Sequence, residues 1–209
     1  PRRPNPPYHR DPRIHNLGDS WLHSGLARFA TTIIDKTAYN GEDVRSVALQ
    51  CIPSSLSVVD LCCGTGTSTR IPGLGIDTSE HMIREAKWRR GRWSQFEVGN
   101  AETYGEDNSF DVATLFFCLH EMPRGARMRV LSNACRISRH AVYIMDISTR
   151  STFSEAMISG EPYLLEYQTN ILEDLSYFYS KVHSVVDDRI LFSEIFCDSN
   201  KYSTPFMKK

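Results

Sequence analysis

The amino-acid sequence predicts an α/β fold: a doubly wound, mostly parallel sheet of seven strands with helices on both faces. Two observations carry this prediction. Between residues 56 and 147, short apolar runs with β-branched residues alternate with segments of helical periodicity, which is typical of parallel strands joined by helices. Near the end of the chain, two strand-like runs form a hairpin pattern, which predicts an antiparallel strand at or near one edge.

The elements before the sheet are predicted to be helical. Residues 1–15 are rich in proline and are expected to form a flexible N-terminus. Apolar residues recur at helical spacing over residues 17–39, which predicts a first helix. A second, shorter helix is predicted over residues 43–51, since Pro53 follows it.

The elements of the sheet follow in order from residue 56. The first run is bounded by Pro53 and Gly64 and contains two valines, which is typical of a buried parallel strand. The predicted strands cover residues 56–61, 74–76, 95–98, 110–117, 141–147, 182–186 and 190–197. The predicted helices cover residues 79–90, 124–137 and 161–181, and a helix of about one turn is expected between Gly66 and Asp77, ended by Pro72-Gly73.

The charge balance argues against several classes of protein. The 209 residues include 24 Lys and Arg against 25 Asp and Glu, a formal net charge of −1. A dedicated binder of nucleic acid or of acidic membranes usually carries a basic excess, so neither partner is expected. No run approaches the roughly 18 to 20 apolar residues of a membrane span. The length suits one domain with a sizeable core.

The cysteine pattern predicts free thiols. The six cysteines stand at positions 51, 62, 63, 118, 135 and 197, and none forms a C-x-x-C pair. Most lie in apolar runs, so a disulfide framework and a zinc site are both disfavoured. We therefore expect the cytoplasm or another reducing compartment, such as an organelle matrix.

The most informative motif joins the first strand to a glycine-containing turn, V-V-D-L-C-C-G-T-G-T over residues 58–67. Gly64 and Gly66 can adopt backbone angles closed to other residues and let a ligand approach the main chain. Ligands of open α/β sheets bind at the carboxyl ends of the strands, where this turn falls. Thr69 stands where G-x-G-x-x-G needs its third glycine, and no Walker-type lysine follows, so a pyrophosphate cradle is disfavoured.

Three further motifs follow the next three strands. Asp77, in G-I-D-T-S, puts a carboxylate where it can accept hydrogen bonds from the ribose hydroxyls of a nucleoside. Asn100, in V-G-N-A-E, follows the third strand and suits an adenine edge. The fourth strand leads into F-F-C-L-H-E-M-P at residues 116–123.

These motifs resemble the class I S-adenosylmethionine-dependent methyltransferases, closest to the small-molecule branch that includes enzymes of ubiquinone and menaquinone biosynthesis. The resemblance covers residues 56–147. It implies a Rossmann-like fold, S-adenosyl-L-methionine as cofactor and methyl transfer to a small-molecule acceptor. Two alternatives stay open: a non-catalytic S-adenosylmethionine-binding scaffold or regulatory domain, and a protein or RNA methyltransferase.

The resemblance also implies a division of the chain and a set of cofactor contacts. Residues 16–209 form one domain, with lid helices at 16–55, a cofactor-binding core at 56–147 and substrate-side helices with the closing hairpin at 148–209. Asn100 departs from the aspartate common in the family, but its side-chain oxygen can still accept a hydrogen bond. The implied cofactor residues are Asp60, Cys62, Gly64, Thr65, Gly66, Asp77, Thr78, Met82, Asn100, Ala101, Glu102, Phe117 and Cys118.

The substrate side is implied by position alone. His120 and Glu121 are the catalytic candidates, and His120 could act as a general base because the pKa of histidine lies near neutrality; alternatively, the pair only shapes the loop before Pro123. Asp146 could face the substrate or only end a strand. No metal is predicted, since Arg124 breaks H-E-x-x-H. Further substrate candidates, each of which could only pack in the core, are Trp21, His23, Tyr163 and Tyr167.

Two motifs are interpreted as incidental. Residues 5–8 spell N-P-P-Y, a signature of methyltransferases that act on amide or adenine nitrogens, but no strand precedes them here. The basic, aromatic segment at residues 84–93 is interpreted as a solvated helix end whose tryptophans, Trp88 and Trp93, pack on the core. Nucleic-acid binding is the alternative for this segment.

Overall fold

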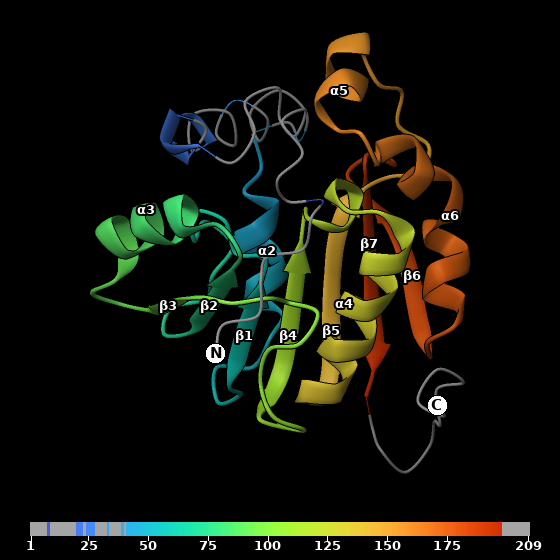
Figure 1. Cartoon of the computed structure of the whole chain (residues 1–209). Helices are drawn as coiled ribbons and strands as arrows, with labels where there is room; N and C mark the ends of the chain where they lie inside the picture. Colours follow the sequence, from blue (N-terminus) through green and yellow to red (C-terminus); the bar gives the residue numbers. More distant parts are fainter. Residues whose placement is uncertain are drawn as a thin grey trace.

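The computed structural model describes residues 8, 20–22, 24–27, 33, 39 and 41–197. Its centre is one sheet of seven strands in the order β3-β2-β1-β4-β5-β7-β6 (Figure 1). The strands are β1 (Val58–Leu61), β2 (Leu74–Asp77), β3 (Gln95–Val98), β4 (Phe110–Phe116), β5 (Ser138–Ile147), β6 (Ser180–Val185) and β7 (Ile190–Phe196). Strands β1 to β5 pair in parallel, and β7 is antiparallel to both of its neighbours. The predicted fold class is confirmed.

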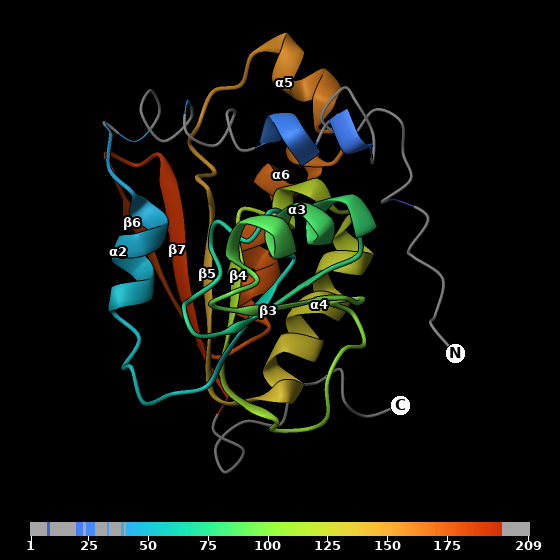
Figure 2. The same cartoon turned by 90° about the vertical axis from the view of Figure 1, so that its left-hand side faces the viewer.

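Helices cover both faces of the sheet (Figures 1 and 2). On one face, α2 packs against β4 and β5, and α3 packs against β3. On the other face, α4 and α6 pack against the central strands in the largest apolar cluster. The helical elements are α2 (Val44–Gln50), α3 (Glu80–Arg90), the 3-10 turn η3 (Leu119–Glu121), α4 (Arg124–Ile137), α5 (Glu155–Gly160) and α6 (Leu164–Ser176).

The burial of β1 explains its continuous apolar run. All four of its residues are buried. Val59 and Leu61 pack into the cluster with α4 and α6, whereas Val58 packs with Ile52 and Val112 on the opposite face. A strand covered on both faces has no solvent-facing positions and therefore loses the polar alternation of a half-exposed strand.

The connection from β1 to β2 differs from the prediction. A helix of about one turn was expected, but residues 62–73, all of them described, form turns. The backbone N–H of Gly66 donates to Cys63, and that of Thr69 donates to Gly66. The Thr69 hydroxyl also donates to Asp60, 2.7 Å away. Such side-chain bonds compete with helical ones, and a threonine-rich segment favours the turn.

The segment before the hairpin also differs from the prediction. One helix over residues 161–181 was expected, but the structure has a shorter helix there, α6, and an unpredicted helix before it, α5, which ends at Gly160. The side chain of Ser154 caps α5 by accepting a hydrogen bond from the N–H of Met157. The break leaves Glu161 at the junction of two helices. Figure 1 shows α5 above the carboxyl ends of the strands.

The interpretation of the basic segment at residues 84–93 was wrong for its two tryptophans. Trp88 is 78% exposed and Trp93 is 61% exposed, so neither tryptophan packs on the core. Arg90 has a structural role, since its guanidinium donates to the backbone carbonyls of Gly66, Thr67 and Thr69. Within the described ranges, no helix is long and apolar enough to cross a membrane.

Candidate active site

A cavity of about 990 Å³ opens at the carboxyl ends of the parallel strands. Its walls come from the turns after β1, β2, β3 and β4, from the segment after β5, and from the hairpin turn at residues 187–189. In an open α/β sheet these ends carry the backbone N–H groups and loop side chains that can meet a ligand. The cavity is therefore the candidate active site.

The turn after β1 leaves space for a ligand at Gly64. Cys62 and Gly64 both have positive φ, 62° and 52°, and both line the cavity. A Cβ built on Gly64 would meet no atom within 4 Å, so it would project into open space rather than into packed protein. A ligand can thus approach the main chain at this position, as the motif predicted.

The carboxylate of Asp77 joins two of these turns. One oxygen accepts the N–H of Gly64 at 2.8 Å, and the other accepts the N–H of Ser79 at 2.9 Å. These bonds hold the carboxylate at the cavity wall. An ionised carboxylate has further acceptor capacity after two hydrogen bonds, so ribose hydroxyls could still donate to it.

The turns after β3 and β4 supply the opposite wall. The Asn100 side-chain oxygen accepts the N–H of Glu102 at 2.9 Å, which stabilises its own turn. Phe117 has a φ of 56°, a strained value for a bulky residue. Its ring lies 4.3 Å from the Arg45 guanidinium and 5.7 Å from the Tyr39 ring. These contacts fix the Phe117 ring at the cavity wall.

The structure brings most of the predicted site residues together. Those lining the cavity are Cys62, Gly64, Thr65, Asp77, Thr78, Met82, Asn100, Ala101, Phe117, Cys118, His120 and Glu121. Trp21 is 73% exposed, and His23 lies outside the described residues. The other predicted residues that do not line the cavity are Asp60, Gly66, Glu102, Tyr163 and Tyr167.

The structure gives several of these residues a supporting role. Asp60 is fully buried and accepts hydrogen bonds from Thr69 and Thr114, and burial raises its pKa to about 7. A Cβ on Gly66 would lie 2.7 Å from the Phe96 ring, so this glycine permits close packing. The Tyr167 hydroxyl donates to the carbonyl of Ile147 at 2.7 Å.

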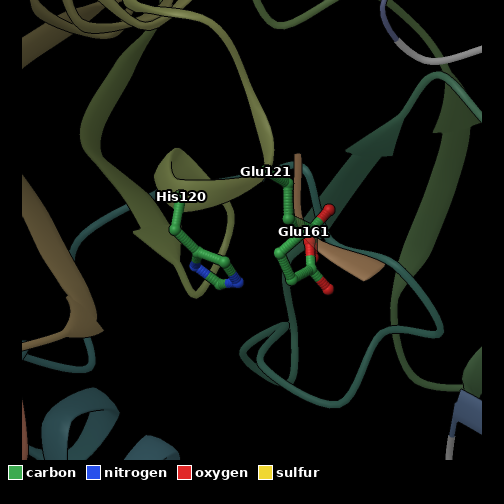
Figure 3. A group of neighbouring side chains, drawn as sticks. All are labelled: His120, Glu121 and Glu161. Carbon is green, nitrogen blue, oxygen red and sulfur yellow. The ribbon is translucent and has the colours of Figure 1, made fainter. Parts of the chain in front are cut away.

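His120 lies in a cluster of carboxylates after β4 (Figure 3). Its Nδ1 lies 2.5 Å from Asp146, and Glu121 and Glu161 face its ring from the other side. Burial lowers the pKa of His120, but Asp146, Glu121 and Glu161 outweigh burial and raise it to about 9. His120 therefore does not have the near-neutral pKa on which the general-base hypothesis depended.

Two contributors to the site, Glu161 and Tyr8, were not predicted from the sequence, and the role of a third, Asp146, was left open. Asp146 is fully buried and accepts the N–H groups of Leu119 and His120, so it organises the η3 turn. Glu161 carries no local motif, and only the break between α5 and α6 reveals its position. Tyr8, in the motif interpreted as incidental, lines the cavity and donates to Glu102 at 2.9 Å.

The fold and the cavity resemble those of class I methyltransferase domains. Residues 58–141 match the family model described as a methyltransferase domain. A demethylmenaquinone methyltransferase of Bacillus licheniformis is 28% identical over 152 residues, which cover 67% of this chain and 64% of that protein. The chain thus spans less than two thirds of the length of the curated relatives it matches.

Solved structures agree on the fold. A protein of Pyrococcus horikoshii has a TM-score of 0.60 at 16% identity, with 79% of this chain and 94% of that chain covered. The magnesium protoporphyrin IX methyltransferase of Synechocystis, solved with bound SAH, has a TM-score of 0.51 at 16% identity, with 73% and 80% covered. The resemblance to class I S-adenosylmethionine-dependent methyltransferases, in their small-molecule branch, is confirmed.

Proposed function

We propose that this protein transfers a methyl group from S-adenosylmethionine to a small-molecule acceptor that binds in the same cavity. One observation carries the proposal: the glycine turn after β1, Asp77 at the end of β2 and Asn100 after β3 line one cavity together with the His120 cluster. That arrangement offers a nucleoside-type site beside a group of polar side chains. The relatives' printed names support the same reaction class.

The proposed cofactor contacts follow from this geometry. Gly64 would lie against the methionine part, where its missing side chain leaves room. Asp77 would accept hydrogen bonds from the ribose hydroxyls, and Asn100 would meet the adenine edge through its side-chain amide. The aromatic wall at Phe117 and the thiol of Cys118 would line the far side.

The proposed catalysis is mainly a matter of position. S-adenosylmethionine supplies a methyl group that its sulfonium already activates. The protein needs to align the acceptor in line with that methyl group and to exclude water, and alignment alone can lower a barrier by several kcal/mol. His120 and Glu121 are proposed to contact the acceptor, since both line the cavity. All six cysteines are free thiols, which supports a reducing compartment.

Calorimetric titration with S-adenosylmethionine tests the cofactor assignment. Wild type should bind one equivalent, and D77A should bind at least tenfold more weakly because the ribose hydroxyls lose a charged acceptor. Asp107→Ala is a matched control, since Asp107 is an exposed aspartate outside the cavity, paired with Arg136. Equal affinities of D77A and wild type would refute the site. Binding without product from a broad panel of acceptors would favour the scaffold alternative.

A further inference from the structure

His120, Glu121 and Glu161 bring three possible metal-ligand side chains to one place on the cavity wall (Figure 3). One imidazole nitrogen and one carboxylate oxygen from each glutamate all lie within 4.8 Å of one another. A first-row divalent ion holds such ligands at about 2.0 to 2.2 Å, so its ligand atoms lie about 3 to 4 Å apart. Small rotations of the glutamate side chains would bring all three atoms to one ion.

Asp146 orients His120 in the way that a metal-binding histidine requires. The Asp146 carboxylate lies 2.5 Å from Nδ1 and also accepts the N–H of Leu119 at 2.8 Å. Asp146 thus occupies Nδ1, and Nε2 is the nitrogen that points toward Glu121 and Glu161. His120 is only 6% exposed. Metal-ligating histidines commonly place their second nitrogen on a carboxylate in this manner.

The charge of the cluster favours a cation. Two glutamates and Asp146 surround a single imidazole, and Asp146 and Glu161 are 0% and 9% exposed. Carboxylates brought together away from water repel one another unless a positive charge lies between them. A divalent ion carries two positive charges where a protonated imidazole carries one, so it would balance the three carboxylates more completely.

We propose that His120, Glu121 and Glu161 bind a divalent first-row transition-metal ion at the acceptor end of the cavity. A mixed imidazole and carboxylate ligand set suits Mn²⁺, Fe²⁺ or Zn²⁺ better than Ca²⁺. This departs from the sequence-based prediction of no metal, which rested on the cysteine pattern and on the absence of H-E-x-x-H. The ligands here are two neighbours on η3 and a third residue from the junction of α5 and α6.

The role of the ion rests on the proposed function. Three protein ligands leave coordination positions of the ion open toward the cavity. A hydroxyl oxygen of the methyl acceptor would coordinate the ion at one of these positions. Coordination lowers the pKa of that hydroxyl, and its proton passes to solvent. The oxygen electron pair then forms the bond to the methyl carbon while the carbon–sulfur bond breaks and the sulfonium becomes a neutral thioether. The substrate class is therefore a hydroxylated small molecule.

Manganese binding tests the site directly. The chelator-treated protein is titrated with Mn²⁺, and free Mn²⁺ is followed by electron paramagnetic resonance. Mn²⁺ is the better probe than Zn²⁺, since the chain has six free thiols that compete for zinc. Wild type should bind one equivalent, and E161Q and E121Q should each bind at least tenfold more weakly. Glutamine keeps the side-chain volume while it removes the charge.

Glu97→Gln is the matched control. Glu97 is exposed on β3 and accepts a hydrogen bond from Tyr104, so E97Q should keep the wild-type Mn²⁺ affinity. Absence of stoichiometric binding to wild type would overturn the proposal, as would equal affinities of E161Q and E97Q. S-adenosylmethionine affinity is measured on the same samples. Its absence would refute the proposed function, whereas cofactor binding without Mn²⁺ binding would refute the metal site alone.

Discussion

Two glycines of one turn serve different physical purposes at the residue scale. A Cβ on Gly64 would enter open space in the cavity, whereas a Cβ on Gly66 would lie 2.7 Å from the Phe96 ring. Both residues have positive φ. The G-x-G pattern alone does not separate them, because the difference lies in what surrounds each glycine after folding.

G64A and G66A should therefore fail in different ways. G64A should lose at least tenfold in S-adenosylmethionine affinity and only about 1 to 2 kcal/mol of stability, the usual cost of a positive φ for a residue with a Cβ. G66A should lose about 1 to 3 kcal/mol more, because its Cβ overpacks the core at Phe96. Calorimetry and urea unfolding measure the two effects. A G64A variant with unchanged cofactor affinity would contradict the assigned position.

Asp60 predicts a pH dependence of stability. Burial raises its pKa from 3.8 to about 7, so the folded protein keeps a proton that the unfolded chain has already released. The resulting stabilisation is present below pH 4 and is lost as the pH rises from about 4 to about 7. D60N has no such proton, so wild type should lose up to about 4 kcal/mol relative to D60N across this window. Urea unfolding at pH 4.5 and pH 8 measures the difference, and parallel profiles would contradict it.

At the scale of elements, an ion pair joins α6 to α4. Arg127 is completely buried, and its Nε donates to Asp174 at 2.7 Å. Its Nη1 also donates to the carbonyl of Met122 at 3.1 Å. Arg124 donates to the other Asp174 oxygen at 2.6 Å. This group of bonds holds the end of η3, which carries His120, against both helices.

D174N should be strongly destabilising. Asparagine keeps the shape but leaves the buried Arg127 guanidinium without its counter-charge, which costs about 3 to 5 kcal/mol. Asp188→Asn is the matched control, because its pair with Arg150 is 51% to 73% exposed and such pairs contribute at most about 1 kcal/mol. Asparagine also tolerates the positive φ of residue 188. Chemical unfolding that showed equal losses for both variants would contradict this account.

The strands and helices of the sheet were largely predictable from the sequence. The predicted limits of β3 and α4 agree with the structure, because periodicity and β-branched runs report burial along a single element. The interpretation was wrong where tertiary contacts compete with local pattern. The threonine-rich link after β1 forms turns, the helix predicted over residues 161–181 is shortened to α6, and α5 was not predicted.

At the scale of the whole molecule, the cavity couples ligand binding to stability. Its walls come from turns far apart in the sequence, so a ligand there joins segments that separate on unfolding. At 100 times its dissociation constant, S-adenosylmethionine should stabilise the fold by about 2.7 kcal/mol. For a chain of this length that corresponds to a rise in Tm of roughly 5 to 10 °C. Differential scanning fluorimetry measures the shift, and D77A, which should bind at least tenfold more weakly, should show at most about half of it at the same concentration.

The sequence by itself determined the order of the elements, the glycine turn, the acidic residue after the second strand and the cofactor class that these motifs resemble. Those features are local, since each depends on neighbouring residues and on the period of one strand or helix. Only the tertiary structure decided that Tyr8 and Glu161 line the same cavity as His120 and Glu121. It also decided that Asp146 supports the cavity wall through the η3 turn. That arrangement depends on where chain segments end and how helices pack on the sheet, and residues 40 positions apart carry no common period that would reveal it.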